Sequence, residues 1–174
     1  VGSEMCIRDS AWLEHPVLVF HDQVISDAEQ IRFARHFGEL EIHPFADNLE
    51  DHPEIIVLEA GGDSPRQNYN AAKDFHIDVS FREKPPMGSI LRGKVIPAKG
   101  GDTRFSNAAA AYEKLQPEIK ARVDDLFAVN DYTKLFGPPT GVNSEDRHED
   151  IIKEFPPVLH PVIRTHPETG KRSI

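Results

Sequence analysis

The sequence has few of the features that mark secreted, membrane-spanning or nucleic-acid-binding proteins. It contains one cysteine, Cys6, so no disulfide framework can form within the chain. It has no apolar run of membrane-spanning length and nothing that resembles a secretory signal, so a cytoplasmic location is expected. Its 20 basic residues are outnumbered by 29 acidic ones, and the net charge of −9 without a basic block argues against nucleic acid or an anionic membrane as a partner.

Length and composition fit one soluble domain. The chain has 174 residues, of which 39% are hydrophobic, an ordinary share for a globular protein with its own core. Residues 1–10, VGSEMCIRDS, show no periodicity and are interpreted as a leader or an artefact. We therefore expect residues 11–174 to belong to a single domain, and the sequence leaves the formation of a homo-oligomer open.

Local signals predict three helices. Ser26 with Glu29 three residues later is a capping box, and the helix that it begins would end at Gly38. Asn107–Leu115 has an alanine-rich helical face. Pro117 is a typical first residue for the helix that follows.

Apolar runs and turn residues predict the remaining elements. Strands are expected at Val17–Phe20, Ile55–Leu58 and Val158–Thr165. Glu168–Lys171 reads as a hairpin-like turn. Asp131–Asn143 contains Gly-Pro-Pro and is interpreted as a loop that forms a mobile lid.

Two potential metal ligands lie one residue apart near the middle of the chain. His76 and Asp78 belong to FHIDVSF, in which apolar and polar residues alternate. Because residues i and i+2 of a strand project from the same face, a strand here would bring imidazole and carboxylate together. One nitrogen donor and one hard oxygen donor are two of the three ligands in the facial triad that holds non-haem Fe(II). The triplet alone is weak evidence, because most His-x-Asp triplets are surface coincidences or local hydrogen-bonded pairs.

The residues after the triplet predict a second strand and a turn. Pro85 and Pro86 force an extended approach, and Ser89–Ile96 then reads as a strand. Lys99–Asp102 is a Gly-Gly turn. The hydroxyl of Thr103, directly after the turn, can donate a hydrogen bond toward a carboxylate beside the metal.

This ordered set of motifs resembles the taurine dioxygenase-like (TauD/TfdA) family of Fe(II)- and 2-oxoglutarate-dependent dioxygenases. The motifs are FHIDVSF, PPMGSIL and GGDTRFSNAAAAYEKL, with FGELEIHP upstream and PPVLHPVIRTHPETGK downstream. They cover nearly all of the chain after Leu18. The resemblance implies a mainly β fold with flanking helices, a double-stranded β-helix (jelly roll, cupin-like) whose C-terminal part is missing from this chain.

The resemblance also implies the cofactors and the reaction. His76 and Asp78 would bind Fe(II), and Thr103 would hydrogen-bond to the carboxylate of the co-substrate 2-oxoglutarate. Oxidative decarboxylation of 2-oxoglutarate by O2 would accompany hydroxylation of a small organic anion, which is a sulfonate, a sulfate ester or a related carboxylate. In the family, the distal histidine ligand and the arginine that binds 2-oxoglutarate come from the missing part, so we expect the 174 residues to be inactive alone.

Three residues are candidates to bind the substrate. His43 matches the family's substrate-contacting histidine, although by composition it is an ordinary loop histidine. Asn70 lies in a polar loop before the metal motif, where asparagine is equally common as a turn residue. Phe136 would form an aromatic wall of the pocket.

The pocket departs from the taurine enzymes at three positions. Ala46 stands where they have a tyrosine, Leu135 where they have a serine and Ala72 where they have an asparagine. A pocket that loses its hydrogen-bonding groups loses its preference for the group that they bind. A larger or more apolar sulfonate, sulfate ester or carboxylate is therefore as plausible a substrate as taurine.

Two other interpretations stay open. The chain is alternatively an inert β-helix fragment or binding module that keeps only two metal ligands, and the presence of the distal histidine and arginine in the whole protein would decide between the two. A zinc hydrolase that uses His-x-Asp is a third interpretation, but it does not explain Thr103 or the downstream motif. His160 and His166 lie next to prolines, and their family counterparts are structural, so neither is expected to be the third ligand.

Overall fold

The chain forms two compact units. The computed structural model describes residues 10–44, 46, 48–58, 75–136 and 144–174. The C-terminal unit comprises Val1–Val19, Phe75–Pro85 and Gly100–Ile174, and the N-terminal unit comprises Phe20–Asp74 and Pro86–Lys99. Among the described residues, no helix has both the length and the apolar character that crossing a membrane requires.

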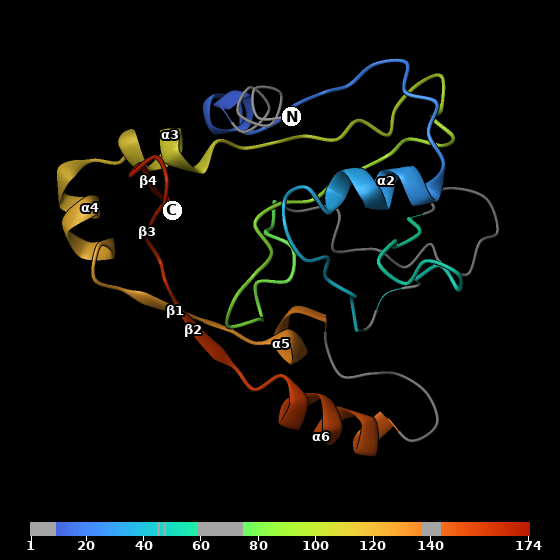
Figure 1. The fold of residues 1–174 in the computed structure, drawn as a ribbon. Helices are drawn as coiled ribbons and strands as arrows, with labels where there is room; N and C mark the ends of the chain where they lie inside the picture. The colour runs from blue at the N-terminus through green and yellow to red at the C-terminus, as the bar shows by residue number, and fades with distance from the viewer. Residues whose placement is uncertain (1–9, 45, 47, 59–74, 137–143) are drawn as a thin grey trace. The chain divides into compact units, whose positions relative to one another are not determined.

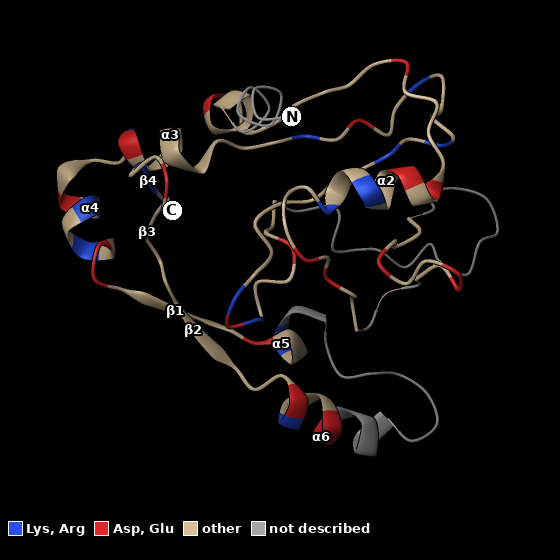
Figure 2. Cartoon of the chain, in the orientation of Figure 1, with Lys and Arg blue, Asp and Glu red and all other residues tan. Residues whose placement is uncertain are grey.

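Helix α2, Asp27–Ala34, organises the N-terminal unit (Figure 1). The predicted capping box is confirmed: the Glu29 amide donates to the Ser26 hydroxyl, and the Glu29 carboxylate accepts from the Ser26 amide at 2.8 Å. Acidic residues in the first turn and Arg32 in the last complement the helix dipole, as the charge colouring of Figure 2 illustrates. The helix ends ahead of Gly38, whose φ of +142° suits a residue without a side chain.

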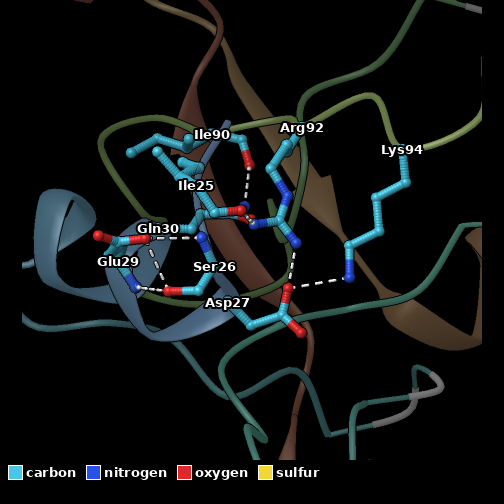
Figure 3. A network of polar contacts seen from close by, with 8 residues as sticks. All are labelled: Ile25, Ser26, Asp27, Glu29, Gln30, Ile90, Arg92 and Lys94. Carbon is cyan, nitrogen blue, oxygen red and sulfur yellow. Dashed lines mark hydrogen bonds and ion pairs between the residues drawn. The ribbon is translucent and has the colours of Figure 1, made fainter. Parts of the chain in front are cut away.

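The start of α2 is tied to the segment that follows the double proline. Asp27 pairs with the guanidinium of Arg92 and, at 2.9 Å, with the ammonium of Lys94 (Figure 3). Arg92 also donates to the carbonyl oxygen of Ile25 at 2.8 Å. The hydrogen bonds from Lys94 and Arg92 lower the pKa of the Asp27 carboxyl. This network holds two segments together that are more than sixty residues apart in the sequence.

The C-terminal unit contains α3 to α6 and a short N-terminal helix described from Ser10 to Glu14. Helix α3, Ala108–Glu113, confirms the prediction for Asn107–Leu115, and the side chain of Asn107 caps it by accepting from the Ala110 amide. Helix α4, Pro117–Val123, begins at the proline as predicted. Helices α5, Tyr132–Phe136, and α6, Ser144–Glu154, follow.

Two small antiparallel sheets complete the C-terminal unit. Strand β1, Phe127–Asn130, pairs with β2, Val158–Pro161, and Ala128 lies opposite His160. Strands β3, Arg164–Thr165, and β4, Arg172–Ser173, form a hairpin, which confirms the turn predicted at Glu168–Lys171.

A polar cluster around Tyr112 fixes strand β4 to the helices. The Tyr112 hydroxyl donates to Asp124 at 2.9 Å, and Arg172 pairs with the same carboxylate at 2.9 Å while its guanidinium lies over the Tyr112 ring. Partial burial of Asp124 tends to raise its pKa, but the hydrogen bonds from Tyr112 and Arg172 outweigh that effect and lower it. The cluster therefore favours the ionised carboxylate.

Several predicted strands are wrong. Val17–Phe20 and Ser89–Ile96 are described in full and have irregular backbone, and Ile56 makes only an isolated bridge with Asn48. Val158–Thr165 is confirmed in part, since β2 and β3 lie within it and bends at Val162 and Ile163 separate them. A strand needs a neighbour for its backbone groups, and the described residues supply none to Val17–Phe20 and Ser89–Ile96. The described part contains small sheets only.

The expected loop at Asp131–Asn143 is partly wrong as well. Its first residues form helix α5, in which the Asp131 carboxylate accepts hydrogen bonds from the amide and hydroxyl of Thr133 and so begins the helix. Residues 137–143 lie outside the described part, so the structure does not bear on a lid there.

The buried core is small and lies mainly in the C-terminal unit. Its members among the described residues are Ile31, Phe81, Tyr112, Ile151, Phe155 and Ile163. Only Ile31 belongs to the N-terminal unit. Phe81 lies three residues after Asp78.

We predict that Ser26→Ala lowers the free energy of unfolding by about 1 kcal/mol, because it leaves the Glu29 amide without its cap. Urea denaturation of the whole protein measures the effect. Ser106→Ala is the control: it removes a hydroxyl from an exposed serine outside the helices and should change the free energy of unfolding by less than about 0.5 kcal/mol. Equal losses in the two variants would contradict the role of the capping box.

Candidate metal centre

The two predicted metal ligands lie together. His76 Nε2 is 3.2 Å from Asp78 Oδ1, and the side chains are 47% and 57% exposed. The expectation that imidazole and carboxylate converge is therefore confirmed, but the expected strand is wrong. Phe75–Ile77 is irregular, and Asp78 begins a turn.

The turn owes its shape to an unusual backbone conformation. Val79 has a φ of +54°, in the left-handed region that β-branched residues rarely occupy. The Arg82 amide donates to the Val79 carbonyl at 3.1 Å and closes the turn. The chain therefore turns immediately after Asp78. Asp78 is the first residue of the turn and does not belong to a strand.

Buried aromatic rings hold the far end of the turn. The Phe81 side chain is 3% exposed and meets the rings of Tyr132 and Phe155 edge-to-face, at centroid distances of 5.2 and 5.5 Å. Such pairs are favourable beyond the area that they bury. The next residue adds a second contact, because the guanidinium of Arg82 lies 4.8 Å from the centre of the Phe155 ring.

Both histidines near the C-terminus have structural contacts. We call the turn Asp78–Arg82 the metal turn, because it begins at a predicted metal ligand. His160 Nε2 lies 2.9 Å from the carbonyl oxygen of Arg82, so strand β2 is bonded to the end of this turn. His166 Nδ1 accepts from the amides of Glu168 and Thr169 inside the β3–β4 hairpin. Each ring therefore supports the backbone, in keeping with the structural role expected from the sequence.

The segment that contains Thr103 approaches the metal turn. The guanidinium of Arg104 lies over the ring of Phe75 at 6.0 Å, so the neighbours of Thr103 and His76 are in contact. Gly100 and Gly101 both have a φ of +75°, which only glycine adopts without strain, at the position of the turn predicted before Thr103. The Thr103 side chain is exposed. The contact between Arg104 and Phe75 brings the residues next to Thr103 and His76 together.

His43 belongs to the N-terminal unit and is half-buried there. Asn48 shapes its loop: the side-chain amide donates to the His43 carbonyl at 3.0 Å, and the backbone amide donates to the Ala46 carbonyl at 3.0 Å. The bridge between Asn48 and Ile56 anchors this loop to the rest of the unit.

The structure describes the side chain of none of four other residues that the sequence places at the substrate pocket. Asn70 and Ala72 lie outside the described residues. Leu135 and Phe136 form the last turn of α5, and their side chains are outside the described part.

The donor set suits a metal ion. An imidazole nitrogen and a carboxylate oxygen at 3.2 Å can bind one cation from the same side, and both are open to solvent. Among the described residues, no group of three or more His, Cys, Asp or Glu side chains is arranged to hold a metal. The described chain therefore places two candidate ligands side by side.

The sequence analysis missed the residues that support these ligands. Phe81 was read only as part of FHIDVSF, and its burial between Tyr132 and Phe155 depends on contacts with residues more than fifty positions away. The left-handed Val79 has no sequence signal, because valine is a strand-forming residue. Asn48 could have been found as a residue typical of turns.

Comparisons with known proteins agree that the chain is similar to one family of dioxygenases. The family model described as taurine catabolism dioxygenase TauD, TfdA family matches residues 7–174. An alkylsulfatase of Acinetobacter baylyi is 36% identical over 169 residues, which are 94% of this chain and 51% of that protein. An alpha-ketoglutarate-dependent sulfate ester dioxygenase of Pseudomonas putida is 34% identical over 171 residues, which are 95% of this chain and 54% of that protein.

A solved structure shows the same similarity in three dimensions. The crystal structure of AAD-2 in complex with Mn(II) and N-oxalylglycine matches with a TM-score of 0.74 and 30% sequence identity. The match covers 100% of this chain and 59% of that one. The chain thus spans about half the length of the curated relatives that it matches.

We predict a measurable coupling between Phe75 and Arg104. A double-mutant cycle with Phe75→Ala and Arg104→Ala, followed by urea denaturation, should give an interaction free energy of about 0.5–1 kcal/mol, because the cation faces an exposed ring. A second cycle pairs Phe75→Ala with Lys114→Ala, which removes a cation from the C-cap of α3, and should be additive. Additivity in both cycles would show that the contact does not join the two segments.

Proposed function

The chain belongs to the taurine catabolism dioxygenase (TauD, TfdA) family, and from this premise we propose that the whole protein is an Fe(II)- and 2-oxoglutarate-dependent dioxygenase. The observation that carries the proposal is the pair His76–Asp78, whose nitrogen and oxygen lie 3.2 Å apart within the matched residues. Mn(II) and N-oxalylglycine, which resembles 2-oxoglutarate, are bound in the solved structure AAD-2 and support the same cofactor classes here. The two small sheets of this chain would then form part of a jelly roll.

The described residues would have separate tasks in this reaction. His76 and Asp78 would bind Fe(II) from one side and leave other coordination positions open. The hydroxyl of Thr103 would donate a hydrogen bond to the carboxylate of 2-oxoglutarate, since the Arg104–Phe75 contact brings its segment to the ligands. Bound Fe(II), with 2-oxoglutarate and O2, supplies the oxidation that converts a C–H bond to C–OH and releases succinate and carbon dioxide.

We also propose that the substrate is an organic sulfate ester or a sulfonate with more hydrocarbon than taurine. Hydroxylation of the carbon that bears the ester oxygen gives an adduct that separates into an aldehyde and sulfate. The names of the Acinetobacter and Pseudomonas relatives support a sulfate ester. The half-buried loop of His43 would provide a hydrogen bond to the anionic head group.

The alanine at position 46 supports the same choice. A tyrosine hydroxyl at this place would offer a polar partner, whereas the methyl group of Ala46 offers none. Taurine has an ammonium group that must be hydrogen-bonded when it leaves water, and an alkyl chain has no such requirement. The pocket would therefore favour an alkyl chain over an ammonium group.

The inert fragment remains the second candidate, because the described residues provide only two ligands. The two candidates make opposite predictions for the whole protein. The dioxygenase should consume 2-oxoglutarate in the presence of Fe(II), and a binding module should not.

We predict that Asp78→Ala abolishes succinate formation in the whole protein. Residues that only support metal ligands typically contribute about 10- to 100-fold to metal affinity or activity. Loss of a ligand itself should therefore lower the rate of succinate formation at least ~100-fold. Asp125→Ala, which removes a carboxylate at an exposed position, is the matched control and should retain activity. Full turnover by Asp78→Ala would refute the ligand assignment.

We predict that a medium-chain alkyl sulfate is turned over with a higher kcat/KM than taurine. Each additional buried methylene should raise kcat/KM about fourfold, which corresponds to about 0.8 kcal/mol. Competition among taurine, an alkyl sulfonate and an alkyl sulfate, with release of sulfite or sulfate as the readout, measures the preference. Ala46→Tyr should move the preference toward taurine. The highest kcat/KM for taurine in the unaltered protein would contradict the substrate proposal and leave the dioxygenase assignment intact.

A further inference from the structure

Two residues of the proposed substrate site are hydrogen-bonded to one asparagine. The side-chain amide of Asn48 donates to the His43 carbonyl at 3.0 Å, and the backbone amide of Asn48 donates to the Ala46 carbonyl at 3.0 Å. In the proposed site His43 would bind the anionic head group, and Ala46 would leave room for an alkyl chain. The backbone positions of these two residues are therefore linked through Asn48.

The backbone of Asn48 is itself anchored. Asn48 forms an antiparallel bridge with Ile56, and the Leu49 amide donates to the Ile55 carbonyl at 2.9 Å. Two further backbone bonds, from the His52 amide to Leu49 and from the Ile55 amide to His52, close the turn between them. Asn48 therefore lies at one end of a hydrogen-bonded turn.

An ion pair connects this turn to helix α2. The Glu54 carboxylate lies 3.0 Å from the guanidinium of Arg35, and the Glu54 side chain is only 17% exposed. Arg35 is the C-cap of α2. A series of contacts thus runs from a helix through the turn to Asn48 and the candidate substrate residues, and all of its members belong to the N-terminal unit.

A carboxamide has the properties that this position requires. The Asn48 side chain is half-buried, supplies N–H donors for a carbonyl, and carries no charge that would repel an anionic substrate. Leucine has nearly the same shape but no donor, and an ionised aspartate has no donor either. Either replacement would remove this bond from the His43 carbonyl.

We propose that Asn48 is a positioning residue for substrate binding: it holds the backbone of His43 and Ala46 in the arrangement that receives the head group and alkyl chain of a sulfate ester. Asn48 acts through the backbone of these two residues. This inference rests on the substrate role of His43 in the proposed function. It adds that substrate affinity depends on a loop that is ordered before the substrate arrives.

The test is isothermal titration calorimetry of the whole protein with hexyl sulfate, after loading with Mn(II) and N-oxalylglycine in place of Fe(II) and 2-oxoglutarate. Asn48→Leu keeps the shape of the side chain and removes the amide. It should raise the dissociation constant of hexyl sulfate about 3- to 10-fold, because the released segment must be ordered when the substrate binds. The fraction of protein that binds hexyl sulfate and the affinity for Mn(II) should stay the same.

Asn130→Leu is the matched control. The Asn130 side chain also donates to a backbone carbonyl, that of Ala128 at 3.3 Å, but it lies on strand β1 in the C-terminal unit. The same chemical change there should leave the dissociation constant of hexyl sulfate unchanged.

A double variant separates positioning from general stability. In a His43→Ala background the head group has lost its partner, so Asn48→Leu should raise the dissociation constant by less than about twofold further. A merely structural role for Asn48 predicts the full loss of about 3- to 10-fold in that background as well, because its effect would not pass through His43.

Each outcome decides the matter. Weaker binding by Asn48→Leu that disappears in the His43→Ala background, with normal binding by Asn130→Leu, supports the proposal. Unchanged binding by Asn48→Leu, equal weakening by Asn130→Leu, or full additivity with His43→Ala overturns it and leaves the proposed function intact. If the unaltered protein does not bind hexyl sulfate, or binds it equally well after His43→Ala, the proposed substrate site fails and this inference fails with it.

Discussion

The burial of Phe81 is the interaction on which the architecture of the C-terminal unit depends. One aromatic ring joins the turn near the middle of the chain to helix α5 and to the residue that follows α6. Burial of a phenylalanine stabilises by about 1.5–3 kcal/mol, and each edge-to-face pair adds about 0.5–1.5 kcal/mol. Few residues of the described chain are buried, and Phe81 is the least exposed of them.

Helices could be predicted from the sequence because their signals are local. Ser26 and Glu29 cap each other across one turn, and the carboxamide of Asn107 reaches an amide three residues on. Strands could not be predicted in the same way. Ser89–Ile96 has the composition of a strand, but its backbone groups need a partner strand, and a partner is a property of the fold and not of the segment. The hairpin at Glu168–Lys171 escaped this difficulty, since its turn fixes the pairing, and the predicted strand Val158–Thr165 contains β2 and β3.

The sequence predicted, through the two-residue period of a strand, that His76 and Asp78 lie together. In the structure the two side chains lie together on irregular backbone that leads into a turn. Either geometry satisfies the pattern His-x-Asp, so the pattern could not distinguish them. The supporting residue Phe81 was hidden for a further reason: its partners lie at positions 132 and 155, and no local motif links them.

The side chains of His76 and Asp78 are exposed, whereas that of Phe81 is buried. Exposed donor groups suit a site that must both bind and release small molecules. The imidazole and carboxylate groups are about half exposed in the folded protein. Open surroundings would also leave room for the anionic co-substrate of the proposed reaction. Among the described residues, the buried ring nearest to this pair along the chain is Phe81, which packs against Tyr132 and Phe155. Close packing and open donors therefore occur within one short segment.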